Sequence, residues 1–131
     1  MRRTYTPPTV PLEDAEQRVI FQWAAMETAA CPELGLLYAI PNGGKRAIKT
    51  AIALKAQGVK SGVPDMCLPV ARNGYHGLYI ELKRQRGGTV SETQKEWIIA
   101  LTGQGYKAVV CRGAEEAIRT IKEYCNNYLK R

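Results

Sequence analysis

Three side chains in the middle of the chain have the types and spacing of a metal-dependent catalytic site. Asp65 follows a proline, and sixteen residues later Glu81 and Lys83 stand two apart in an apolar run. Side chains alternate along a strand, so Glu81 and Lys83 share one face, and a hairpin of this length brings Asp65 level with Glu81. Two close carboxylates repel each other unless a cation lies between them. The pattern therefore predicts a site for a hard divalent ion, Mg²⁺ or Mn²⁺.

Such a site predicts phosphodiester hydrolysis. Mg²⁺ takes oxygen ligands and keeps several waters, so the backbone carbonyl of Leu82 could complete a shell around Asp65 and Glu81. The ion would lower the pKa of a water and neutralise the phosphodiester, while Lys83 positions or deprotonates that water or stabilises the developing charge. The alternative is structural, because Asp after Pro is common in turns and Glu-x-Lys on an edge strand is often a solvated ion pair.

Two glutamates near the start of the first expected helix are further candidates for the site. Glu16 falls among the apolar positions of that helix, where a charge needs a cation, a metal or a hydrogen-bond donor. Glu13 lies about 60° round the helix and is the alternative ligand. Either one could instead be an ordinary first-turn glutamate that the helix dipole favours. The sequence leaves these alternatives open.

Hydrophobic periodicity and turn residues predict one α/β domain, residues 1–131, with elements in the order α, β, α, β, β, α, β, α. The expected helices are 12–30, 45–58, 91–102 and 114–129, and the expected strands are 36–40, 66–70, 78–83 and 107–111. Residues 1–11 form an extended arm. The two middle strands form a hairpin, and the helix before the last strand makes the last two strands parallel in a mixed sheet. In the first helix, the side chains expected to face the core are Leu12, Val19, Trp23 and Met26.

The charge of the chain favours a polyanionic partner, first of all nucleic acid. Nineteen Lys and Arg against twelve Asp and Glu give a net charge of +7,. A helix start binds phosphate through its N–H groups, and a Gly-rich turn precedes the basic second helix. Basic side chains contact phosphates without reading sequence. The expected DNA-binding residues are Asn42, Gly43, Gly44, Lys45, Arg46, Lys49, Arg84 and Arg86, with a solvated helix face as the alternative.

Other sites and compartments are disfavoured. Four cysteines without a CxxC pair and a single histidine argue against a zinc site or a disulfide framework, so the cysteines are expected to be reduced and mostly buried,. No window reaches the roughly 18 apolar residues of a membrane span. The N-terminal arm lacks the apolar region of a signal peptide. We therefore expect a protein of the cytoplasm.

Three motifs together resemble the VRR-type nuclease (VRR-NUC) branch of the PD-(D/E)xK superfamily. They are Gly62-x-Pro64-Asp65, Ile80-Glu81-Leu82-Lys83 and Ser91-x-x-Gln94-x-x-Trp97, with Pro41-Asn42-Gly43-Gly44 between the first helix and the first motif. The resemblance implies a restriction-endonuclease-like αβββαβ core with the basic helix inserted and a C-terminal helix added. It implies metal ligands at Asp65 and Glu81, a catalytic Lys83, a first-helix acid at Glu13 or Glu16, and a supporting Gln94. Gln94 also fits a capping box with Ser91.

The resemblance further implies a Mg²⁺-dependent endonuclease that acts on branched DNA. Small stand-alone members of this family, typical of phages, are associated with four-way (Holliday) junctions, whereas members fused to repair proteins act on flaps. The resemblance to the small members implies that the cell is bacterial or phage-infected. One small domain with one site would need a twofold dimer to make paired cuts. The alternatives are a nuclease acting on flaps, single strands or RNA, and a basic nucleic-acid-binding module without catalysis.

Overall fold

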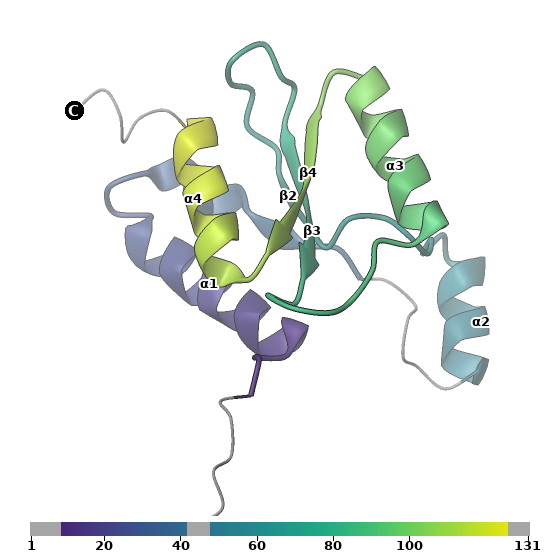
Figure 1. Cartoon of the computed structure of the whole chain (residues 1–131). Coiled ribbons are helices and arrows are strands. Elements are labelled where there is room, and N and C mark those ends of the chain that lie inside the picture. The colour runs from purple at the N-terminus through teal and green to yellow at the C-terminus, as the bar shows by residue number, and fades with distance from the viewer. Residues whose placement is uncertain (1–8, 42–47, 126–131) are drawn as a thin grey trace, which may run out of the picture.

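The computed structural model describes residues 9–41 and 48–125, and its elements follow the expected order (Figure 1). They are α1 (Glu13–Glu27), the 3-10 helix η1 (Pro32–Leu36), β1 (Tyr38–Ala39), α2 (Ile48–Ala56), β2 (Met66–Leu68), β3 (Leu78–Lys83), α3 (Glu92–Gly103), β4 (Lys107–Arg112) and α4 (Ala114–Cys125). The first strand is shorter than predicted because a proline opens η1, which takes up the first residue of the expected strand,.

The sheet is mixed and has the order β1-β2-β3-β4. Strands β1, β2 and β3 pair antiparallel, and β3 and β4 pair parallel, which confirms both predicted pairings. The hairpin between β2 and β3 closes at Asn73 and Gly74, whose φ angles of 54° and 84° are those of a type I′ turn,. Met66 lies opposite Ile80 in the register, so Asp65, one residue before β2, stands level with Glu81.

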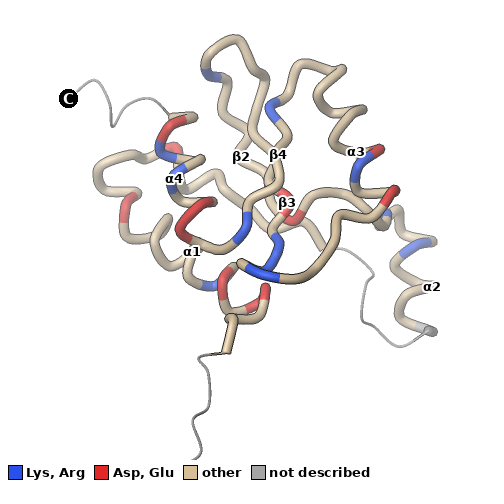
Figure 2. Tube along the Cα trace, viewed as in Figure 1, with Lys and Arg blue, Asp and Glu red and all other residues tan. Residues whose placement is uncertain are grey.

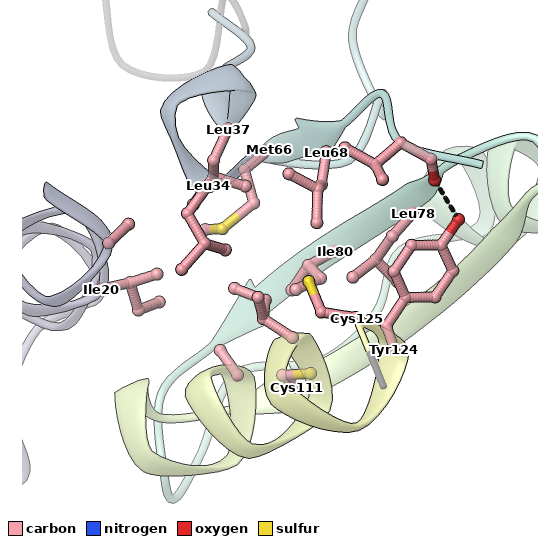
Figure 3. Close-up of a cluster of buried hydrophobic side chains, with 14 of the residues drawn as sticks. Ile20, Leu34, Leu37, Met66, Leu68, Leu78, Ile80, Cys111, Tyr124 and Cys125 are labelled. Carbon is pink, nitrogen blue, oxygen red and sulfur yellow. Dashed lines mark hydrogen bonds between the residues drawn. The ribbon is translucent and has the colours of Figure 1, made fainter. Parts of the chain in front are cut away.

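Helices α1 and α4 cover one face of the sheet, and α3 lies on the other face, against β4 (Figure 1). The core lies between the sheet and helices α1 and α4 (Figure 3). At one end of it, the Tyr124 hydroxyl donates to the Val70 carbonyl. All four cysteines are buried, as expected. The largest buried side chains of this core are Ile20, Leu34, Met66, Leu68, Leu78, Ile80, Leu82 and Ile121.

The predicted core stripe of α1 is wrong. Leu12, Val19 and Met26 are exposed, Met26 by 79%, and only Trp23 packs against the core. The buried residues of α1 are instead Glu16, Ile20 and Ala24, which follow each other at the four-residue spacing of one helix side,. Apolar residues occur on several sides of this helix, so periodicity alone does not select the buried one.

The other helices agree more closely with the sequence. Gly58 (φ 97°) ends α2 in a Schellman motif, with Gly58 N–H donating to Lys55 and Val59 N–H to Leu54,. Helix α4, expected over residues 114–129, buries Ala117 and Ile121. None of the described helices is both long and apolar enough to cross a membrane.

Candidate metal site

Asp65 is held in place by the backbone of both neighbouring strands. Its N–H donates to the Ile80 carbonyl at 2.9 Å, and its own carbonyl accepts from the Ile40 N–H at 2.8 Å. Its Oδ2 accepts from the Leu82 N–H at 2.6 Å. These three bonds fix the carboxylate at the edge of β3, beside Glu81 in the register.

Glu81 is a carboxylate buried in a site that lacks enough positive charge. It is 2% exposed, and its Oε1 has no hydrogen-bond partner among the described residues. Burial, together with the nearby Asp65 carboxyl, raises the pKa of Glu81 to about 9, and Lys83 opposes this only in part. Glu13 adds to the increase in the pKa. A further cation would let Glu81 ionise at neutral pH.

Lys83 projects from the same face as Glu81, as the strand alternation predicts. Its Nζ lies 3.8 Å from Glu81 Oε2, and the residue is 7% exposed. The pair is therefore buried rather than solvated, unlike the ion pair of the structural alternative. When both carboxyls are ionised, one ammonium faces two carboxylates, and a metal ion could neutralise the excess negative charge in place of the proton on Glu81,.

Gln94 makes the contacts that both of its sequence-based roles require. Its backbone N–H donates to Ser91 Oγ at 3.1 Å, and its Oε1 accepts from the Ser91 N–H at 2.9 Å, which completes the capping box. Its Nε2 also donates to Glu81 Oε2 at 3.4 Å. The start of α3 thereby orients one oxygen of Glu81.

The two first-helix glutamates have different surroundings. Glu16 Oε1 accepts from Gln85 Nε2 at 3.2 Å, and its Oε2 accepts from the Ala114 N–H, the first of α4. A Cβ on Gly113 would lie 2.9 Å from that Oε2, so a glycine lets the carboxylate reach the helix start. Glu16 thus has the donors that its burial requires. Glu13 is the acid whose charge acts on Glu81.

This difference predicts opposite results for two matched substitutions. Glu16→Gln removes a charge-assisted bond at the start of α4 and is expected to lower the free energy of unfolding by about 1.5–3 kcal/mol. Glu13→Gln is expected to change it by less than about 0.5 kcal/mol, yet to weaken metal binding about 10- to 100-fold. Urea unfolding and Mn²⁺ titration of both variants check this. Weakened metal binding in Glu16→Gln alone would reverse the assignment.

The donor set suits a hard divalent ion. The Ile80 carbonyl and the Leu82 N–H both point towards the Asp65 side of β3, and alternation puts the Leu82 carbonyl on that same edge,. Within residues 9–41 and 48–125, no three His, Cys, Asp or Glu side chains gather as a ready-made metal shell. Two carboxylates, a carbonyl and waters are the shell that Mg²⁺ or Mn²⁺ accepts.

A close packing contact holds the loop that leads into Asp65. Gly62 has a φ of 87°, and a Cβ there would lie 2.5 Å from Thr93 Cγ2. Gly58 has a similar φ of 97° but open space around it. We expect Gly58→Ala to cost about 1–2 kcal/mol of stability and Gly62→Ala about 2–4 kcal/mol, because overpacking adds to the backbone strain. Equal losses of stability in the two variants, measured by thermal unfolding, would show that the contact with Thr93 adds nothing to the cost of Gly62→Ala.

The expected DNA-binding residues are only partly described. Arg84 donates to the carbonyls of Val10 at 2.7 Å and Pro11 at 3.3 Å, and so fastens the arm next to α1. Arg112 in turn binds the carbonyls of Gly87 and Gly88 in the loop after β3. No pattern in the sequence indicated either contact. Arg86 is exposed. Outside the described residues lie Asn42, Gly43, Gly44, Lys45, Arg46 and the side chain of Lys49.

Charged residues gather where the start of α1 meets the end of β3. Figure 2 shows the acidic start of α1 beside the basic end of β3 and the loop that follows it. The arm contacts of Arg84 join the two segments. The candidate site therefore lies where the start of α1, the end of β3 and the start of α3 come together.

Comparisons with known proteins agree with the family resemblance that the sequence motifs indicated. The family model for the VRR-NUC domain matches residues 10–115. A solved structure titled "VRR_NUC domain protein" is 32% identical, with a TM-score of 0.77 over 90% of this chain and 91% of that chain. A search of curated proteins gave no significant match. The structural similarity confirms the expected restriction-endonuclease-like α/β fold.

Proposed function

The chain belongs to the VRR-NUC family of nucleases, and from this premise we propose that it hydrolyses DNA phosphodiester bonds with a divalent metal ion held by Asp65 and Glu81. The observation that carries the proposal is the buried Glu81 Oε1, which has no partner among the described residues and lies beside a second carboxylate. A carboxylate pair without enough positive charge is costly in a fold unless it binds a cation.

Each residue of the site has a role in this reaction. Asp65, fixed by the Leu82 N–H, and Glu81, oriented by Gln94, bind the ion, with the Leu82 carbonyl as a further ligand. The ion, Mg²⁺ or Mn²⁺, supplies an acidified water and neutralises charge on the phosphodiester. Lys83 Nζ stabilises the negative charge that develops on the phosphate oxygens, or holds the attacking water. Glu13 completes the acidic side of the site.

The substrate we propose is branched DNA, such as a four-way junction. The net charge of +7 favours a nucleic-acid partner,. Backbone phosphates would lie along the start of the basic α2 and near Arg86, without sequence readout. Two symmetric cuts across a junction require two copies of the site, so we propose a twofold dimer.

One substrate panel tests this proposal. End-labelled four-way junction, flap, linear duplex and single strands of DNA and RNA are incubated with Mg²⁺ and, separately, with EDTA. We expect cutting only with Mg²⁺ and fastest on the junction. Equal rates on all forms would contradict structure selectivity. A monomeric mass by light scattering, with and without junction DNA, would contradict the dimer.

A second candidate function is a basic nucleic-acid-binding module without catalysis. The observation that favours it is the Glu81–Lys83 contact of 3.8 Å, which a purely structural ion pair would also form. Such a module would bind all the labelled substrates and cut none of them under any metal condition.

A further inference from the structure

A row of side chains crosses the sheet next to the carboxylates. The register places Tyr38 opposite Cys67, Cys67 opposite Tyr79, and Tyr79 opposite Ala108. Tyr79 and Glu81 are two residues apart in β3 and therefore project from the same face. The tyrosine row thus lies about 7 Å along the strands from the row of Asp65 and Glu81.

The two tyrosines of this row have different surroundings. They stand on either side of the buried Cys67. The ring of Tyr79 meets Tyr106 edge to face, with centroids 5.3 Å apart. Tyr38, at the β1 end of the row, has only two rotatable side-chain angles, so its ring would lose little conformational freedom when it binds a ligand,.

Tyr38 nevertheless remains 48% exposed. It lies on β1 at one edge of the sheet, whereas α3 packs against β4 at the opposite edge. An aromatic ring that is half exposed on the catalytic face offers a surface for stacking,.

The ligand that fits is a nucleobase. The proposed function puts a DNA phosphate at Asp65 and Glu81, and the register puts the Cα of Tyr38 about 8 Å from that of Asp65 and about 12 Å from that of Glu81, so a base attached to that strand lies within reach of the ring,. A base in a duplex has both faces covered by its neighbours, whereas an unpaired base can stack on an aromatic side chain. The chain's net positive charge retains the strand that carries the base,.

We infer that Tyr38 is a base-stacking residue for an unpaired nucleotide next to the phosphate that is cut, an inference that rests on the proposed function for the position of the strand. It gives branched DNA a physical advantage over linear duplex, because strand exchange points and flaps expose unpaired or easily unpaired bases. Tyr38 is a specificity residue in this account.

Binding measured without cleavage tests the inference. Fluorescence anisotropy in EDTA compares a labelled single-stranded DNA of about 12 nucleotides with a blunt duplex of the same sequence. Tyr38→Ala and Tyr38→Leu are expected to weaken single-strand binding about 5- to 100-fold and duplex binding by less than about twofold. Tyr38→Phe and Tyr38→Trp keep a ring and should retain wild-type affinity. Tyr75→Ala, at the exposed hairpin tip, is the matched control and should bind like wild type.

Two binding results would overturn the role of Tyr38. Wild-type affinity in Tyr38→Leu, or equal losses on single strands and duplex, would overturn the inference, because either result removes stacking as the cause. Thermal melting of all the variants identifies any that fail to fold, and Tyr38→Phe and Tyr38→Leu, which retain a large side chain, still decide the question. Absence of Mg²⁺-dependent cutting by the wild type would reject the proposed function, whereas the binding result tests only the role of Tyr38.

Discussion

Glu81→Gln is expected to stabilise the metal-free protein and at the same time to abolish DNA cleavage. The substitution leaves Asp65 and Lys83 as a balanced pair and removes a buried carboxyl group that must take up a proton at neutral pH and whose Oε1 has no partner among the described residues. Relief of an unsatisfied buried polar group is worth about 1–3 kcal/mol, or roughly 3–10 °C in Tm for a domain of this size. Cleavage should fall at least about a thousandfold, because a metal ligand is lost.

The gain in stability should depend on pH. In the metal-free fold the pKa of Glu81 is about 9, against an ordinary value of 4.5. Between these values the folded state keeps a proton that the unfolded state releases, so the free energy of unfolding decreases as pH rises. The stabilising contribution is complete below pH 4.5 and is lost as pH rises through 9. Because Glu81→Gln lacks this group, its advantage over wild type should grow across that range.

Two controls separate the metal site from a structural ion pair. Mn²⁺ should raise the Tm of the wild type and leave that of Glu81→Gln unchanged, because only a bound ligand stabilises the fold. Glu92→Gln, an exposed glutamate on α3, should behave like wild type throughout. If Glu81→Gln instead lost about 3–5 kcal/mol, the pair with Lys83 would be structural.

Lys83→Met is expected to lower the rate of cleavage about 100- to 1000-fold while DNA affinity stays within about twofold. Methionine keeps the buried stem but removes the ammonium that would stabilise charge in the transition state. The same change leaves two carboxylates without their cation, so the metal-free protein should be less stable and Mn²⁺ should bind more tightly.

Single-turnover cleavage and anisotropy measure both quantities for Lys83→Met. Lys95→Met, at an exposed lysine on α3, is the matched control and should cut at the wild-type rate. A single-turnover cleavage rate in Lys83→Met equal to that of wild type would show that Lys83 takes no part in the mechanism.

Local rules were enough to predict which side chains come together at the centre of the candidate site. Alternation along β3 places Glu81 and Lys83 on one face, and the hairpin register brings Asp65 level with Glu81,. The need of Glu16 for a partner also followed from its position among apolar residues. The identity of that partner could not be predicted, because Ala114 lies 98 residues further on and every residue except proline has a backbone N–H.

Long-range contacts account for the rest of what the sequence missed. The buried side of α1 depends on how the helix meets α4 and the sheet, and apolar residues on several of its sides made the periodicity ambiguous. The contacts of Arg84 with the arm join residues more than seventy positions apart. The tyrosine row exists only through the pairing of β1 with β2, and two residues are too short for a strand pattern to predict its register,.

Single-turnover cleavage of one labelled DNA by wild type and Asp65→Asn, with Mg²⁺ and with EDTA, tests the central claim most directly. The asparagine keeps an oxygen that can accept from the Leu82 N–H, so the fold and DNA binding should persist while the charge that holds the metal is lost. The account predicts cutting by wild type with Mg²⁺ only, and none by the variant. Cutting in EDTA, or by Asp65→Asn at the wild-type rate, would contradict a metal held by Asp65 and Glu81.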